Sequence, residues 1–190
     1  CVFVAHKVTL VGTGGDDTRT FRSIDSDVEP AGPQIDTSGP IFTYDKVVEV
    51  EGEEVTIKAF APGQAKIYQA LNGKLHYFDP ATETYAAVGA DATAVVNSIG
   101  FNAEDDLIYG VAVKTGVDAL GNPVSMGDLV IYDATGATYR AGETPYRSWT
   151  GDFDDQGNLW YFEADMDRVT RVDVGDRDAD GNPVATTYKL

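Results

Sequence analysis

The stretch Leu159-Trp160-Tyr161-Phe162, followed by Val169-Thr170-Arg171-Val172-Asp173, indicates the fold class of this chain of 190 residues. Both runs are short and rich in aromatic and β-branched residues, which is typical of β-strands. The same two-part phrase occurs twice earlier in the chain. Its first part appears as Lys66-Ile67-Tyr68 and Leu107-Ile108-Tyr109-Gly110, and its second part as Leu75-His76-Tyr77-Phe78-Asp79 and Leu129-Val130-Ile131-Tyr132-Asp133.

The spacing of this phrase predicts propeller-like repeats. Tyr68 and Tyr109 lie 41 residues apart, and Tyr109 and Tyr161 lie 52 apart because a polar excursion, residues 114–127, lengthens the second interval. A period of about 40 residues with four short strands per unit is typical of propeller blades, since stacked blades bury the faces that one sheet leaves open. We therefore expect an all-β fold, a partial or modular β-propeller with about three blade-like repeats.

The repeats are preceded by a region of different character. Alternating apolar residues at 2–10 predict a strand, and residues 23–40, with several prolines and glycines, predict a long surface loop. Two β-rich runs around Glu51-Gly52-Glu53 predict a hairpin. We expect two parts: residues 1–63 as an N-terminal strand and hairpin region with a Pro/Gly-rich loop, and residues 64–190 as the repeats. Three units are fewer than a closed ring needs, so we expect the repeats to be part of a larger assembly or a longer chain.

The charge balance limits the partners. The chain carries 31 acidic and 14 basic side chains, a net charge of -17. Such a surface repels phosphate backbones, so nucleic acid is not an expected partner. No stretch of about 20 apolar residues is present, and we therefore expect no transmembrane segment. The expected partners are other surface or matrix macromolecules, or copies of the chain itself.

Cys1 is the one cysteine, which excludes an internal disulfide. It suggests either the acylated first residue of a bacterial lipoprotein or an incidental start of the chain. The expected location is secreted or at the cell surface, with Cys1 as a lipid anchor in the first case.

Catalytic residues are not expected. The chain has two histidines; His6 and His76 both lie in predicted strands, away from a turn where a nucleophile would meet them. The Gly-rich stretch at 12–15 lacks the Lys-Ser/Thr of a phosphate-binding loop. We therefore predict no catalytic and no cofactor-binding residues, and a protein that is not an enzyme.

One stretch resembles half of a calcium-binding loop. Asp176, Asp178, Asp180 and Asn182 place side-chain oxygens at alternate positions with Gly181 in sixth place, but position twelve is Thr187 instead of glutamate. Calcium at these four residues is one interpretation, and a plain acidic hairpin turn is the other. A similar stretch, residues 118–124, carries fewer acids, which favours the turn; Asp152, Asp154 and Asp155 form a second acidic cluster.

Three aromatic residues lie in or near a turn-rich stretch. Tyr139, Tyr146 and Trp149 either line a carbohydrate-binding groove or pack between neighbouring blades.

Several phrases carry a family resemblance. Four of them are Asn97-Ser98-Ile99-Gly100-Phe101-Asn102, Asp106-Leu107-Ile108-Tyr109-Gly110, Gly127-Asp128-Leu129-Val130-Ile131-Tyr132-Asp133 and Thr150-Gly151-Asp152-Phe153-Asp154. Through these phrases, residues 64–190 resemble the propeller-like repeat domain of bacterial secreted and cell-surface proteins, the family labelled DUF6923. This resemblance implies an extracellular, multidomain, non-enzymatic protein and supplies no functional residues. More weakly, Gly157-Asn158-Leu159-Trp160-Tyr161-Phe162-Glu163 with residues 168–173 resembles blades of streptogramin-lyase-type propellers.

Together these features favour a non-enzymatic structural or adhesive β-propeller module that mediates protein or glycan interaction or self-assembly. Two alternatives stay open. One is a streptogramin-lyase-like or glycan-cleaving propeller enzyme, and the other is a subunit of an extracellular filament or surface lattice.

Overall fold

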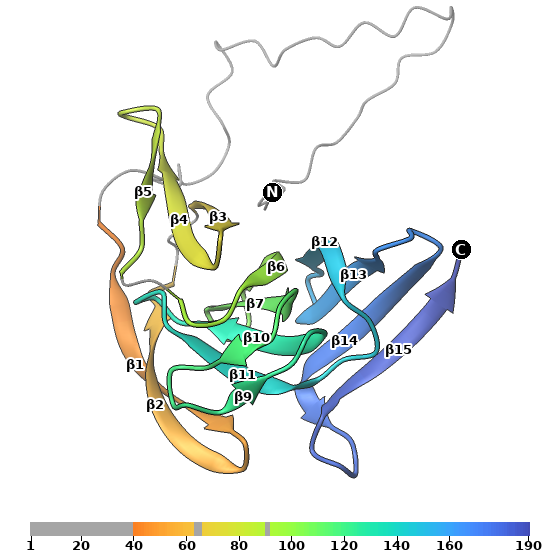
Figure 1. The fold of residues 1–190 in the computed structure, drawn as a ribbon. Coiled ribbons are helices and arrows are strands. Elements are labelled where there is room, and N and C mark those ends of the chain that lie inside the picture. The colour runs from red at the N-terminus through yellow and green to blue at the C-terminus, as the bar shows by residue number, and fades with distance from the viewer. Residues whose placement is uncertain (1–39, 63–65, 90–91) are drawn as a thin grey trace, which may run out of the picture.

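A computed structural model describes residues 40–62, 66–89 and 92–190 of the chain (Figure 1). Within these ranges every regular element is a β-strand, so the all-β prediction is confirmed. The predicted strand at 2–10, most of the loop at 23–40 and Cys1 lie outside the described residues. No helix in the described ranges is long and apolar enough to cross a membrane.

Three antiparallel sheets follow one another along the repeat region. In each, the two parts of the recurring phrase form neighbouring strands: β3 pairs with β4, β7 with β10, and β13 with β14. The first sheet has three strands in the described residues, and the second and third have four each. The strands are β3 (Ile67–Leu71), β4 (Lys74–Asp79) and β5 (Thr84–Ala87); β6 (Val96–Asn102), β7 (Leu107–Ala112), β10 (Asp128–Tyr132) and β11 (Thr138–Glu143); and β12 (Ser148–Phe153), β13 (Asn158–Glu163), β14 (Arg168–Arg177) and β15 (Pro183–Lys189).

The polar excursion forms a small hairpin of its own. Its strands, β8 (Gly116–Val117) and β9 (Pro123–Val124), pair with each other. Strands β7 and β10, on either side of the excursion, still pair directly in the sheet. The excursion therefore lengthens the repeat without interrupting its sheet, as the spacing of the phrase predicts.

The hairpin predicted before the repeats is present. Strands β1 (Thr43–Val50) and β2 (Glu53–Phe60) pair along their whole length. The two residues of the connecting turn, Glu51 and Gly52, have φ of 51° and 79°, as in the tight turns that match the twist of a hairpin. Asn72-Gly73, between β3 and β4, has the same form with φ of 51° and 85°.

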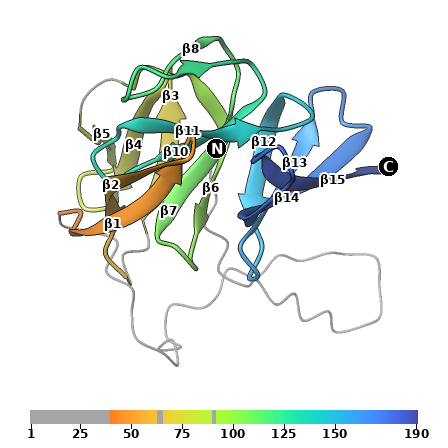
Figure 2. The same ribbon diagram turned by 90° about the horizontal axis from the view of Figure 1, so that it is seen from below.

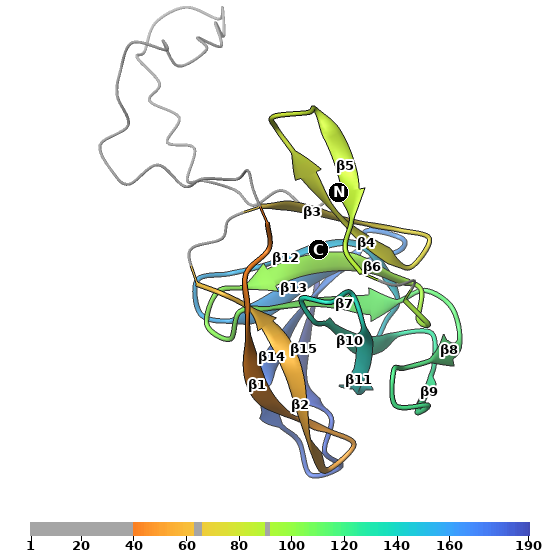
Figure 3. The ribbon, with the colours of Figure 1, turned by 90° about the vertical axis from the view of Figure 1, so that its left-hand side faces the viewer.

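The sheet β6-β7-β10-β11 lies in the middle of the molecule and is covered on both faces (Figure 2). On one face, Ile108, Val130 and Tyr132 share a buried cluster with Tyr68 and Leu75 of the first sheet. On the other face, a second cluster joins this sheet to β12–β15 and to the β1–β2 hairpin; its members include Val50, Ile57, Leu107, Tyr109, Leu129, Ile131, Leu159, Tyr161 and Val172. Figure 3 shows the hairpin projecting beside these sheets.

The first strands of the second and third sheets, β6 and β12, come very close together. A Cβ added at Gly100 would lie 2.8 Å from Cδ2 of Phe153 and 3.1 Å from Cα of Asp152. Only glycine fits such a close approach of two backbones. None of the described sheets closes on itself, so the structure is a stack of sheets in sequence order.

Candidate binding site

A recurring turn, Asp-x-x-Gly-x, holds several of the acidic residues that the sequence singles out, among them Asp154, Asp178 and Asp180. In the turn at 118–122, Asp118 Oδ1 accepts hydrogen bonds from the N–H groups of Leu120 (2.9 Å) and Asn122 (2.8 Å). The turn at 178–182 repeats this arrangement, with Asp178 Oδ1 accepting from Asp180 and Asn182 at 2.9 Å each. Turns at 133–137 and 154–158 have the same pattern of bonds.

The four residues of the predicted calcium site are distributed along the β14–β15 connection. Asp176 is in β14, whereas Asp178, Asp180 and Asn182 are in the turn. Asn182 Oδ1 accepts from the N–H of Glu143 (2.9 Å), on the neighbouring sheet. In the ranges that the structure describes, no three His, Cys, Asp or Glu side chains gather closely enough to hold a metal ion. The turn accounts for the bonds of Asp178, and calcium at Asp176, Asp178, Asp180 and Asn182 stays a prediction.

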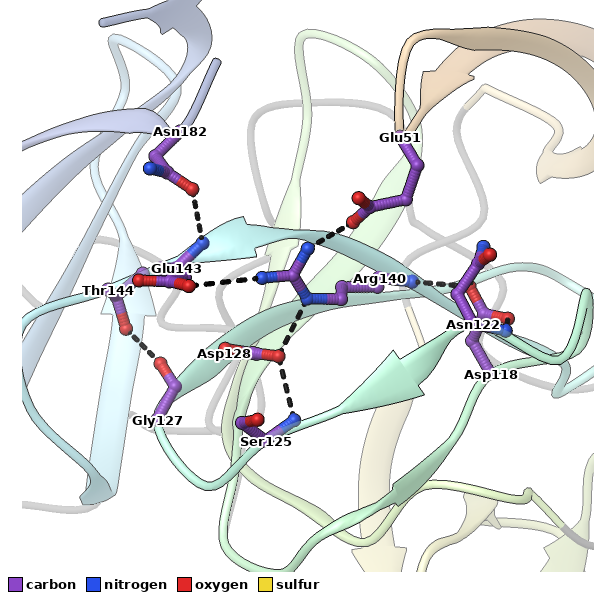
Figure 4. Close-up of polar contacts among 10 residues, drawn as sticks. All are labelled: Glu51, Asp118, Asn122, Ser125, Gly127, Asp128, Arg140, Glu143, Thr144 and Asn182. Carbon is purple, nitrogen blue, oxygen red and sulfur yellow. Dashed lines mark hydrogen bonds and ion pairs between the residues drawn. The ribbon is translucent and has the colours of Figure 1, made fainter. Parts of the chain in front are cut away.

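Arg140 on β11 is the centre of a polar cluster that joins several elements (Figure 4). Its Nε donates to Asp128 Oδ2 at 2.7 Å, and its Nη1 donates to Glu51 in the β1–β2 turn. Its backbone N–H donates to Asp118 Oδ2 at 3.1 Å. Burial by itself lowers the pKa of Arg140, but the bonds to Asp128 and Glu51 outweigh it and raise the pKa above its ordinary value.

This cluster has a structural role. Asp128 is buried, at 3% exposure, and also accepts from the N–H of Ser125 (2.8 Å). A buried carboxylate must be paired, and Arg140 supplies the pairing charge. The cluster therefore ties the hairpin turn and the excursion to the middle sheet. Its hydrogen-bonding groups are used in these contacts, so few of them are available to a ligand.

The face of the β12–β15 sheet that points away from the middle sheet has a different character, and we call it the outer face. Leu159 and Tyr161 on β13 point inward and are fully buried; Trp160 and Phe162 alternate with them and belong to the outer face. The strand register places Asp152 opposite Trp160, and Trp160 opposite Arg171. A second row of this face is Thr150, Phe162, Val169 and Tyr188.

A surface pocket of about 370 Å³ opens on the outer face. That volume is at the lower end of the range of about 300–1,000 Å³ usual for small-molecule sites. Three aromatic residues, two acids and one residue with a hydroxyl group line the pocket. Its lining residues are Thr150, Gly151, Asp152, Phe153, Asp154, Trp160 and Phe162.

The two carboxylates of the pocket differ in their surroundings. Burial raises the pKa of Asp152, against a smaller lowering by the N–H of Phe153. Burial also acts to raise the pKa of Asp154, but hydrogen bonds from Trp160, Asn158 and Gln156 outweigh it, and the net pKa is lowered. Asp154 is therefore occupied in its own turn and in holding Trp160 Nε1 at 2.7 Å, whereas Asp152 faces the pocket with one backbone hydrogen bond, from Phe153 (2.9 Å).

Of the two interpretations of Tyr139, Tyr146 and Trp149, packing holds for the first two. Tyr139 is 9% exposed and belongs to the second buried cluster, against which Tyr146 packs. Trp149 is 50% exposed and lies 5.8 Å from the guanidinium of Arg147. Trp160, Phe162 and Tyr188 do not stand out as a group in the sequence, because their proximity depends on the pairing of β13, β14 and β15.

Comparisons with known proteins agree with the repeat pattern. The model of a family described as a repeat of unknown function (DUF6923) matches residues 65–189. No curated protein matches the chain.

Proposed function

The chain belongs to the DUF6923 family of repeats of unknown function, and we propose that it is a non-enzymatic recognition module of the extracellular space or cell surface. In this proposal it holds another macromolecule on the outer face of β12–β15. The observation that carries the proposal is the pocket between Asp152, Trp160 and Phe162 on this face.

The contrast between the sheets supports a binding role for the outer face. Both faces of the middle sheet are covered by neighbouring elements, but the outer face presents aromatic side chains to solvent, with Tyr188 at 45% exposure. Trp, Tyr and Arg are the residue types that contribute most to binding energy at interfaces. The outer face carries all three, in Trp160, Tyr188 and Arg171.

The chemistry of the pocket supports binding without catalysis. A glycosidase needs two available carboxyl groups on either side of a sugar bond, and the oxygens of Asp154 are already bonded to Trp160, Asn158 and Gln156. Asp152 is then the one available acid of the pocket. His76, which the lyase alternative would require, lies on β4 in the first sheet, with its Nδ1 3.0 Å from the carbonyl oxygen of Lys74.

The propeller-like arrangement is part of the same proposal. The meander of four antiparallel strands in β12–β15, the similar sheet β6-β7-β10-β11 and the close approach of β6 to β12 support it. In this arrangement the sheets form a rigid scaffold, and one exposed face displays the binding residues.

An adhesion assay tests the proposed function. Beads coated with the protein are passed over immobilised polysaccharides and over purified extracellular matrix proteins. We expect retention on at least one of these macromolecules and its loss in the Trp160→Ala variant. The Trp149→Ala variant is the matched control, because Trp149 is exposed but does not line the pocket.

Three outcomes would contradict the proposal: retention on none of the surfaces, equal retention of Trp160→Ala, or turnover of a polysaccharide that disappears in Asp152→Asn. The last outcome would favour the enzyme alternative. Concentration-dependent self-association that is lost in Trp160→Ala would favour the filament alternative.

A further inference from the structure

We infer that the pocket of the outer face takes one neutral sugar ring, a hexopyranose unit of a glycan, placed against Trp160. This inference rests on the proposed function, because it names the chemistry of the ligand at the same face. It is carried by an aromatic platform, by an acceptor beside that platform with unused hydrogen-bonding capacity, and by the charge of the molecule.

The platform is held in place before any ligand arrives. Trp160 Nε1 donates to Asp154 Oδ2 at 2.7 Å, so the polar edge of the indole is already bonded. The indole stacks with Tyr188, with ring centroids 6.0 Å apart and planes at 19°. What Trp160 offers the pocket is therefore an apolar ring surface in a fixed position. A pyranose ring has C–H groups on its faces, which pack against such a surface, and fixing the indole beforehand lowers the entropy cost of binding.

An acceptor lies beside this platform. Asp152 is opposite Trp160 on β12 and lines the same pocket. Neighbouring strands are about 4.8 Å apart, so the carboxylate lies within reach of the edge of a sugar ring that is placed against the indole.

The acid of the pocket has unused hydrogen-bonding capacity. The hydrogen bond found for the Asp152 carboxylate within the described ranges comes from the N–H of Phe153 to Oδ1. A partly buried carboxylate is costly unless hydrogen-bond donors satisfy it. A sugar carries several hydroxyl groups, and two of them can donate to the acid together.

The charges disfavour anionic ligands. The net charge of -17 and the carboxylates in the pocket repel phosphates, sulfated sugars and uronic acids. A neutral ligand that donates hydrogen bonds to Asp152 and packs an apolar face against Trp160 fits both the charge and the shape of the pocket.

The two tryptophans of the chain provide the experiment. In a ¹H–¹⁵N NMR titration of the intact protein, neutral monosaccharides and disaccharides are compared with glucuronic acid. We expect at least one neutral sugar to shift the indole N–H signal of Trp160 with a Kd in the millimolar range, about -4 kcal/mol. The indole signal of Trp149 is the internal control and should stay unchanged.

Two variants separate a specific site from a general surface effect. Asp152→Asn keeps the shape of the side chain and removes the carboxylate, and we expect sugar affinity to fall at least tenfold. Asp155→Asn changes a neighbouring exposed acid that does not line the pocket, and it should bind as the unmodified protein does. Each variant's spectrum shows directly whether it is folded.

The inference is overturned if no neutral sugar shifts the Trp160 signal, if glucuronic acid binds as tightly as the neutral sugars, or if Asp152→Asn binds unchanged. Bead retention that depends on Trp160 but is accompanied by no sugar shift would leave the proposed function standing and remove the sugar. Absence of both would remove both.

Discussion

At the scale of single residues, many aspartates of this chain act as acceptors for backbone N–H groups in turns. Asp118, Asp133, Asp154 and Asp178 each accept two such bonds from the residues that follow them. Aspartate favours turns for this reason, because its short side chain satisfies N–H groups that a strand would otherwise pair. Part of the acidic composition therefore has a local structural cause, separate from any effect on solubility or partners.

The turns at 118–122 and 178–182 predict unequal effects of the same substitution. Asp118 is 2% exposed and also accepts from Asn122 Nδ2 (3.0 Å) and from the N–H of Arg140 (3.1 Å). We expect Asp118→Ala to lower the free energy of unfolding by about 3 kcal/mol, since several buried donors lose their acceptor. Asp178→Ala, in an exposed turn, should cost much less. Urea unfolding of both variants measures this, and equal losses would contradict it.

Asp152 predicts a stability effect that depends on pH. Burial raises its pKa above the ordinary 3.8, so its charged form is less favourable in the folded than in the unfolded chain. The folded state therefore loses stability as the pH rises through this raised pKa. We expect Asp152→Asn to be more stable than the unmodified protein near pH 7, with the difference disappearing below the ordinary pKa. Thermal unfolding across this pH range measures the stability difference. A variant less stable than the unmodified protein at pH 7 would mean that burial does not raise the pKa of Asp152.

At the scale of elements, the β1–β2 hairpin is joined to the repeats by backbone and side-chain bonds. Phe60 N–H donates to the carbonyl of Asp106 (3.0 Å), and Ala134 N–H donates to the carbonyl of Lys58 (2.7 Å). Tyr44 Oη donates to Asp106 Oδ2 at 2.9 Å. Since Arg140 also bonds to Glu51, the hairpin is held at its open end and at its turn.

Arg140 is the residue whose loss should loosen this junction most. We expect Arg140→Ala to lower the free energy of unfolding by about 2 to 3 kcal/mol, because Asp128 would be left buried without its cation. Arg147→Ala is the matched control, since Arg147 contacts the exposed Trp149 ring and the sulfur of Met126. Chemical denaturation compares the two. A similar loss in both variants would mean that Arg140 contributes no more than a surface charge.

Gly100 tests the close approach of β6 to β12. A methyl group at this position would overlap Phe153, so we expect Gly100→Ala to destabilise the protein by about 2 kcal/mol. It should also disturb the pocket, because Phe153 and Asp152 line it. Gly175→Ala is the control, as the nearest atom to its added Cβ, Asp173 Oδ1, is 3.6 Å away. Unchanged stability of Gly100→Ala would mean that the two strands separate easily.

The elements were predictable where their determinants are local. The Glu51-Gly52 and Asn72-Gly73 turns, the recurring strand phrases and the added length between Tyr109 and Tyr161 all follow from neighbouring residues. The sequence singles out Asp152 and Asp154 of the site as an acidic cluster. It does not show that Trp160 lies beside them, because Asp152 and Trp160 come from two strands and β12 is offset by a bulge at residues 148–150. For Tyr139 the sequence left a groove and packing between blades open, and the pairing of β11 with β10 places it in the core.

At the scale of the whole molecule, the net charge of -17 is the dominant property. Mutual repulsion of like charges destabilises a compact state, and salt screens it, with a Debye length of about 10 Å at 0.1 M. We expect the melting temperature to rise as sodium chloride increases from about 0.02 M to about 0.5 M, over the range where screening changes most. Calorimetry measures this, and a falling melting temperature would mean that attractive ion pairs outweigh the repulsion.

Calcium at constant ionic strength separates screening from a specific site. If Asp176, Asp178, Asp180 and Asn182 hold an ion, calcium should raise the melting temperature beyond the effect of sodium, because an ion bound to the folded state stabilises it. Asp180→Asn should remove the additional rise. Equal melting temperatures in calcium and sodium would mean that the turn at 178–182 binds no ion.

The β8–β9 excursion has a consequence for engineering. Because β7 and β10 pair directly although the chain leaves the sheet between them, added length at the tip of this connection does not interrupt their pairing. A Cβ added at Gly121, at the tip of the excursion, would meet nothing within 4 Å. A peptide epitope grafted between Leu120 and Gly121 would thus be presented on a two-stranded stalk. The repeat would then serve as a display scaffold in which the pairing of β7 with β10 is kept, while the bonds of Asn122 to Asp118 mark how close to the sheet an insertion can begin.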